Sequence, residues 1–180
     1  MLSLMERESN YVGIAGACGE GTNVLNNYLT FFNGMVPIGL GSFVGIFTNR
    51  GTLTLGQLTV QDGTSNTIGI GEVDGGFYQN RRLYKLTWMG IGSGGVFMGT
   101  RRGNIDHSPY EMSSKHTAGC NVVFGDGSVR TLRYGNASLF NGPTPASVIP
   151  PPNTPQDWFS LMTLVGRRDG FNRDVSAIID

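Results

Sequence analysis

Charged side chains are scarce in this sequence. Asp, Glu, Lys and Arg make up 14% of the 180 residues, against roughly 25% in an ordinary soluble domain. The 13 basic residues balance the 13 acidic ones, so the formal net charge is zero. Because nucleic-acid binding requires a basic surface that neutralises phosphates, this balance argues against a nucleic-acid partner.

Long apolar runs are also missing. No run of 18 apolar residues occurs, and the longest candidate, residues 35–47, is interrupted by Pro37 and three glycines. The first eight residues lack a basic region followed by an apolar one, so they do not form a secretory signal. Nothing in the sequence is therefore expected to span a membrane.

Cysteine is rare as well. The two cysteines, Cys18 and Cys120, lie far apart and show no C-x-x-C spacing, which argues against a zinc site built from thiolates. Two alternatives remain for the pair. They form one long-range disulfide, which would require an oxidising compartment, or they are two small buried thiols.

Glycine, by contrast, accounts for 28 residues, roughly twice its usual share. Short alternating apolar and polar segments lie between the glycine-rich stretches and predict strands. An Asp-Gly pair, Asp126-Gly127, separates two of them and predicts a hairpin. The predicted strands are residues 11–17, 45–48, 67–72, 83–89, 95–98, 121–124 and 128–132.

One amphipathic helix is predicted near the C-terminus, over residues 155–166, with Thr154 as its N-cap. A proline-rich linker, residues 143–155, leads into it. These patterns predict a single domain over residues 1–180 in the α+β class. We expect it to be β-dominated, with an antiparallel twisted sheet, long glycine-rich loops and the C-terminal helix.

A polar segment precedes the predicted strand that ends at Glu72. Side chains of this kind hydrogen-bond to their own backbone and build tight turns, which is our interpretation of the segment. A calcium loop is the alternative, although the acidic spacing of an EF-hand is absent. The segment consists of Asp62, Gly63, Thr64, Ser65, Asn66 and Thr67.

His116 and Asp126 stand before and after one predicted strand. Four to five residues at about 3.3 Å each would separate them, so direct contact is not expected, and turn chemistry accounts for Asp126. A metal-assisted hydrolase using His107, His116, Asp126 and Glu72 is a weaker alternative. None of the motifs H-E-x-x-H, G-x-S-x-G or the P-loop supports it.

A binding module for a surface polysaccharide is another alternative. Its platform would be a row of exposed aromatic rings, since such rings supply large contact areas. The candidate rings are Trp88, Tyr84, Tyr110 and Trp158, and each of them could instead belong to the core.

His116, nine further residues and then Asp126-Gly127 resemble the His-x9-Asp-Gly motif of a large family. This family comprises the prepilin-type, processing-associated proteins of Planctomycetes, or domain of unknown function 1559. Four other segments resemble family segments in the expected order. They are residues 10–16, residues 45–47, the block from Asp62 to Glu72, and the segment from Leu161 to Gly170.

The resemblance implies a pseudopilin-like head, non-enzymatic, on the cell envelope or in an extracellular filament. It implies assembly with copies of itself or other pilin-like subunits through an N-terminal helix that this sequence lacks, which would also be its only membrane contact. No catalytic residue carries over and no cofactor is expected. A calcium ion, as in some pseudopilin heads, would have Asp62, Glu72 and Asp126 as weak candidate ligands.

Local roles follow from the same interpretation. The Asp62–Thr67 segment locks its turn, and Glu72 bonds loop amides or an ion. His116 and Asn121 order the start of the hairpin, whose turn is made by Asp126 and Gly127.

Overall fold

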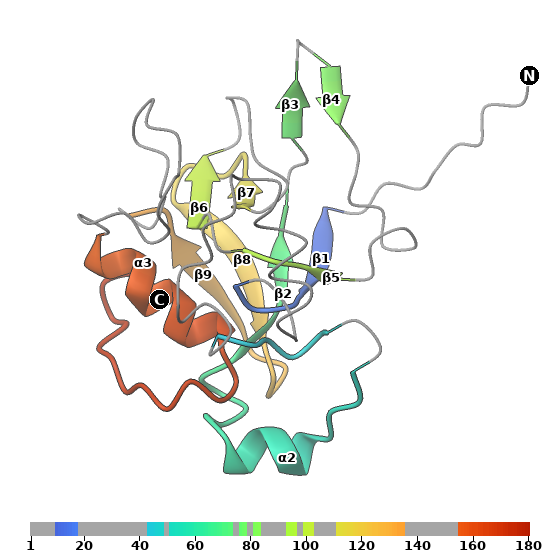
Figure 1. Cartoon of the computed structure of the whole chain (residues 1–180). Helices are drawn as coiled ribbons and strands as arrows, with labels where there is room; N and C mark the ends of the chain where they lie inside the picture. The colour runs from blue at the N-terminus through green and yellow to red at the C-terminus, as the bar shows by residue number, and fades with distance from the viewer. Residues whose placement is uncertain are drawn as a thin grey trace, which may run out of the picture.

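A five-stranded sheet forms the centre of this computed structural model (Figure 1). The structure describes residues 10–17, 43–48, 51–73, 76–78, 81–83, 93–96, 99–102, 111–135 and 155–180. The strand order is β5-β1-β2-β8-β9. The strands are β1 (Tyr11–Ile14), β2 (Ile68–Glu72), β5 (Ser93–Gly94), β8 (Gly119–Phe124) and β9 (Val129–Arg133).

Four of these strands are antiparallel neighbours, and only β5 pairs in parallel, with β1. Two small two-stranded sheets accompany the main one. Strands β3 (Gly76–Tyr78) and β4 (Arg81–Leu83) are antiparallel, whereas β6 (Gly99–Arg102) and β7 (Glu111–Ser114) are parallel. The predicted β-dominated α+β class is confirmed.

The alternating side chains of β8 explain which face of the sheet is buried. Cys120, Val122 and Phe124 are buried, whereas Asn121 and Val123 between them are half-buried. Helix α3 (Gln156–Val165) contributes its apolar residues to the same core, and Trp158 is fully buried there. Figure 1 shows α3 beside the β9 end of the sheet and α2 beyond one end of its strands.

The predicted C-terminal helix exists, but its start differs from the expected one. Pro155, not Thr154, is the N-cap, and it makes no side-chain capping hydrogen bond. The backbone of Pro155 is extended, with ψ of 147°, so the first helical residue is Gln156. Thr154 and the linker residues 143–154 lie outside the described residues.

A second helix, α2 (Leu55–Val60), was not predicted. A capping box opens it: the Thr54 side chain accepts from the Gln57 N–H, and the Gln57 side chain accepts from the Thr54 N–H. The Thr-x-x-Gln pattern was therefore a readable signal. The predicted strand at residues 45–48 is wrong: this segment is not a strand, although Gly45 and Phe47 hydrogen-bond to residues 14–15 and an isolated bridge joins Gly16 to Val44.

The C-terminus covers the outer edge of β9. Ile179 forms a bridge with Leu132, the Arg133 N–H donates to the Ile178 carbonyl (2.7 Å), and the Asp180 N–H donates to the Thr131 carbonyl (3.1 Å). These bonds occupy edge groups that would otherwise be open to another strand. Within the described ranges, no helix is long and apolar enough to cross a lipid bilayer.

Candidate functional site

Two of the predicted motifs meet at one end of β2. His116 Nε2 lies 3.5 Å from Glu72 Oε1, and Glu72 Oε2 accepts a hydrogen bond of 3.0 Å from the Asn121 N–H. The Glu72 side chain is 11% exposed and that of His116 is 63% exposed. A largely buried carboxylate therefore holds both a surface imidazole and the backbone of β8.

Tyr134 fixes the loop that carries the imidazole. Its hydroxyl lies 2.6 Å from the Ser114 carbonyl and 3.2 Å from the His116 carbonyl, and donates to them. The His116 N–H donates to Ser114 Oγ (3.2 Å). We call Glu72, Ser114, His116, Cys120, Asn121 and Tyr134 the His116 cluster.

Cys120 lies at the base of the His116 cluster. It is a free thiol and fully buried, which corrects the disulfide alternative for this residue. Burial raises its pKa to about 12, so the thiol stays protonated at neutral pH. The Tyr134 hydroxyl is its neighbour, and burial raises the pKa of that tyrosine as well. Cys18 lies outside the described residues.

The His116 cluster pairs an imidazole with a carboxylate, as hydrolases do, but its possible nucleophiles are poorly placed. A nucleophile must reach both the base and the substrate. Ser114 is 1% exposed and Cys120 is 0% exposed and protonated. The hydrogen bonds of the cluster instead connect a loop to two strands.

A second group of motif residues surrounds the polar turn at the other end of β2. Asn66 Nδ2 donates to the Asp62 carbonyl (3.1 Å), and Thr67 Oγ1 donates to the Gly63 carbonyl (3.0 Å). Thr64 contributes its main-chain carbonyl, which accepts from the Asp126 N–H (3.0 Å). The Ser65 side chain is exposed and makes no hydrogen bond to the described residues.

The β8–β9 turn is attached directly to this polar turn. The Gly125 N–H donates to the Thr67 carbonyl (2.9 Å). Asp126 Oδ1 accepts from the Ser128 N–H (2.8 Å), and the Ser128 hydroxyl together with this N–H lowers the pKa of the Asp126 carboxyl. Gly127 has a φ of +83°, as the tight turn requires.

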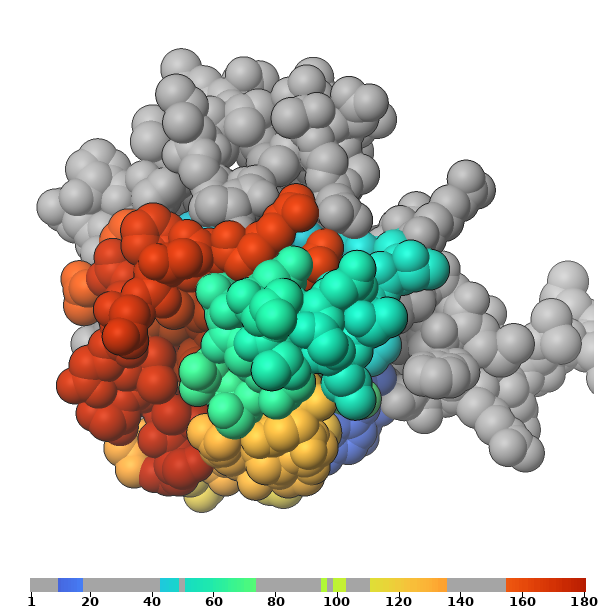
Figure 2. Space-filling view, turned by 90° about the horizontal axis from the view of Figure 1, so that it is seen from below, coloured from blue at the N-terminus to red at the C-terminus, as the bar shows by residue number. Residues whose placement is uncertain are grey.

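The C-terminal segment joins the same group. Asp62 Oδ2 accepts from the Asp169 N–H (3.0 Å), and the Asp62 N–H donates to the Arg167 carbonyl (3.2 Å). Burial, and then the nearby Asp62 carboxylate, raise the pKa of Asp169 to about 6. We call residues 62–67, 124–128 and 167–171 the turn cluster. Figure 2 shows residues 51–66 between the C-terminal segment (red) and the β8–β9 hairpin (yellow to orange).

The family-like segments at residues 10–16 and 45–47 are also joined by main-chain hydrogen bonds. The Gly45 N–H donates to the Ala15 carbonyl (2.9 Å), and the Phe47 N–H donates to the Ile14 carbonyl (3.0 Å). The Arg167 N–H donates to the Val44 carbonyl (2.8 Å). Segments spread along the chain thus form one connected hydrogen-bonded set.

Comparison with known families gives a match over the central part of the chain. Residues 82–137 match the model of the family described as protein of unknown function (DUF1559). The predicted family is thereby confirmed over this segment, which contains both His116 and Asp126. No curated protein and no solved structure matches the chain.

The three weak candidate ligands for calcium are not brought together. Asp126 lies in the β8–β9 turn, beside the start of β2. Glu72, by contrast, is the last residue of β2. Asp62 instead bonds the Asp169 N–H. Among the described residues no group of three or more His, Cys, Asp or Glu side chains could hold a metal ion.

The aromatic platform considered from the sequence fails at Trp158, which belongs to α3 and is fully buried. Its ring makes an edge contact with Phe159, with 5.0 Å between ring centroids, so its role is in the core. The structure does not describe the other candidate rings, which are Trp88, Tyr84 and Tyr110. His107 also lies outside the described residues.

Proposed function

We propose that this protein is a non-enzymatic interaction domain, the globular head of a pilin-like or type II secretion pseudopilin-like subunit. It would be displayed on the cell envelope or in an extracellular filament, and would assemble with copies of itself or with other pilin-like subunits. The observation that carries the proposal is that the family-like segments hydrogen-bond to one another.

The use of the motif residues supports a structural role. In an enzyme, distinctive residues converge on a place where a substrate can lie. Here the Glu72 carboxylate and the Tyr134 hydroxyl are directed at backbone groups of neighbouring loops and strands. Asp62 and Asp126 are directed at backbone N–H groups in the same way. These bonds hold long loops on a small sheet.

The composition of the chain fits an assembled or extracellular protein. Glycine is abundant, charge is low and the net charge is zero. Such a chain has weak electrostatic repulsion between copies, which favours close association with neighbours.

Localisation in the native cells tests the proposal. Antibodies raised against this 180-residue chain would be applied to intact cells and to material sheared from them, with antibodies to an abundant cytoplasmic enzyme as the control. We expect labelling of intact cells, loss of label after external protease treatment, and recovery of the antigen in the sheared or envelope fraction. Recovery of the antigen only in the fraction that contains the cytoplasmic enzyme would overturn the proposal.

An activity screen addresses the enzyme alternative. The purified chain would be assayed with esters, peptides, phosphoesters and glycosides. His116→Ala would be compared with Lys115→Ala, an exposed neighbour outside the His116 cluster. Hydrolysis that is abolished in His116→Ala and kept in Lys115→Ala would show a catalytic imidazole and contradict a non-enzymatic role.

A further inference from the structure

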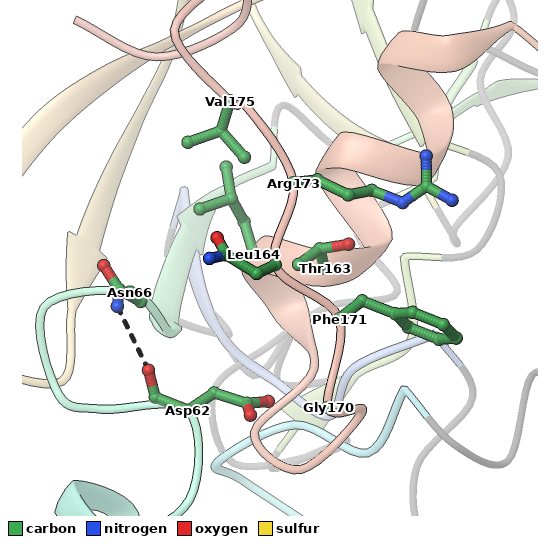
Figure 3. Close-up of a pocket in the computed structure, with 9 residues that line it drawn as sticks. Asp62, Asn66, Thr163, Leu164, Gly170, Phe171, Arg173 and Val175 are labelled. Carbon is green, nitrogen blue, oxygen red and sulfur yellow. Dashed lines mark hydrogen bonds between the residues drawn. The ribbon is translucent and has the colours of Figure 1, made fainter.

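A pocket of about 350 Å³ lies between the polar turn and the C-terminal segment. Ligand pockets in proteins generally have volumes of about 300–1,000 Å³, so this one has room for a small molecule. Figure 3 shows Asp62 and Asn66 on the turn at one side of the C-terminal segment, with Phe171 and Arg173 extending from that segment on the other.

The polar groups of the pocket have hydrogen-bonding capacity left over. Asp62 uses Oδ2 for the Asp169 N–H, while Oδ1 has no partner among the described residues. Asn66 uses its amide nitrogen for the Asp62 carbonyl and leaves its oxygen unused by that part of the chain. Asn172 and the Arg173 guanidinium make no hydrogen bond to described residues. The pocket therefore offers both donors and acceptors to a ligand.

The aromatic ring of Phe171 also lines the pocket, on the Arg173 side of the C-terminal segment (Figure 3). Phe171 is 51% exposed, so half of its side chain is open to solvent. Phe43 supports it, with 6.0 Å between ring centroids, and the Arg173 guanidinium carbon lies 6.0 Å from its centroid. A ring held from two sides is a rigid surface on which an apolar face of a ligand can stack.

The charges of the pocket cancel. Asp62 contributes one negative charge and Arg173 one positive charge, and they are the charged residues that line the pocket in the part of the chain that the structure describes. The net charge of these two lining residues is zero, so it favours neither an anionic nor a cationic ligand. The ligand chemistry that matches is therefore neutral, rich in hydroxyl groups and apolar on one face, which is the chemistry of a sugar ring.

We propose that this pocket binds a neutral saccharide, with Phe171 stacking on a sugar face and with Asp62, Asn66 and Arg173 bonding its hydroxyl groups. The inference is independent of the proposed role as a pilin-like head. It also uses residues different from the aromatic row expected from the sequence.

A titration followed by amide chemical shifts tests the proposal. The ¹⁵N-labelled chain would receive glucose, galactose, mannose and N-acetylglucosamine, and the disaccharides cellobiose and chitobiose. Glucosamine, galacturonic acid and glycine would serve as charged comparators. We expect saturable shifts confined to residues 62–66 and 170–175. Tighter binding of a disaccharide than of its monomer would indicate a polysaccharide as the source, and equal binding a free sugar.

Two exposed phenylalanines provide a matched pair of variants. Phe171→Leu keeps an apolar side chain but removes the stacking ring, and should weaken binding about tenfold. Phe47→Leu, at a ring 44% exposed and outside the pocket, should leave it unchanged. Phe171→Tyr keeps the ring and should retain binding. Circular dichroism would confirm that each variant is folded.

Three results would overturn the proposal. The first is no saturable shift with any neutral sugar at concentrations up to about 50 mM, well above the roughly millimolar dissociation constants of weak sites. The second is equal binding by wild type and Phe171→Leu. The third is a preference for a charged comparator, which would show a pocket for an ionic ligand instead.

Discussion

The imidazole of His116 lies 3.5 Å from the carboxylate of Glu72, so the two most distinctive motifs of the sequence meet at one end of a strand. The same carboxylate accepts a hydrogen bond from the Asn121 N–H. Of these two contacts, the bond to the backbone is the more sheltered, because His116 is 63% exposed at its side chain.

Substitutions at Glu72 should separate the two contacts. Glu72→Gln keeps an acceptor for the Asn121 N–H and should lower the free energy of unfolding by under about 1 kcal/mol. Glu72→Ala leaves that N–H without its partner and should cost about 1–3 kcal/mol more. His116→Ala should resemble Glu72→Gln. Urea unfolding of the three variants measures this. Equal losses for Glu72→Gln and Glu72→Ala would show that charge, not the backbone bond, dominates.

Tyr134→Phe should loosen the loop that carries His116. The substitution removes the hydroxyl that donates to the Ser114 and His116 carbonyls, and should cost about 1–2 kcal/mol. Hydrogen exchange should become faster at residues 115–119 and stay unchanged in α3. Uniform acceleration over the whole chain would instead mean that only global stability had changed.

Cys120 should resist thiol reagents in the folded protein. Its thiol is buried and its pKa is raised to about 12, so the thiolate that reacts is both rare and inaccessible. Iodoacetamide labelling at pH 8, read by peptide mass spectrometry, should modify Cys120 only after urea is added. The peptide that carries Cys18 is read separately in the same digest. Labelling of Cys120 at the rate of a free thiol without denaturant would disprove its burial.

Gly16→Ala should be severely destabilising. Gly16 has a φ of +85°, and a Cβ placed there would lie 2.1 Å from the Phe43 carbonyl oxygen. Strain and overpacking together should cost about 3 kcal/mol or more. Gly56→Ala is the matched control, because this α2 residue has its nearest atom at 3.9 Å and helix propensity favours alanine by about 1 kcal/mol. Thermal unfolding should move the two midpoints in opposite directions.

Asp169→Asn should stabilise the protein in a pH-dependent way. The folded-state pKa of about 6 lies above the usual 3.8, so the folded protein binds more protons between these values. The stability that this protonation supplies is fully present below about pH 4 and is lost as the pH rises through about 6. Since Asp169 is half-exposed, we expect Asp169→Asn to gain only about 1 kcal/mol at pH 7 and almost nothing at pH 4.

Asp174→Asn provides the opposite control for that experiment. The Ser176 hydroxyl and N–H lower the pKa of the Asp174 carboxyl, so its contribution is present above the unfolded pKa and is lost as the pH falls. Urea unfolding at pH 2, 3, 4, 5, 6 and 7 should therefore separate the two variants: the difference between Asp169→Asn and wild type grows from pH 4 to 7, whereas that of Asp174→Asn changes only below about pH 4. A pH-independent difference in stability between Asp169→Asn and wild type would mean that burial does not raise the pKa of the Asp169 carboxyl.

Local patterns were sufficient wherever neighbouring residues decide the structure. The alternation around Asp126-Gly127 predicted the β8–β9 hairpin, and the apolar face of residues 156–165 predicted α3. Helix α2 was equally predictable from Thr54 and Gln57, and was missed because it is only six residues long. The segment around Phe47 looked like a strand, yet no strand of the described residues pairs with it.

The sequence by itself determined the β-dominated class, the hairpin, the C-terminal helix and the match of residues 82–137 to a family model, because turns, periodicity and motifs depend on residues close together in the chain. Only the tertiary structure decided that β2 lies between β1 and β8, and this placement brings Glu72 to His116 and Thr64 to Asp126. The same holds for the pocket between Asp62 and Phe171. Which strands pair depends on how the whole core is buried, and a short segment of sequence does not contain that information.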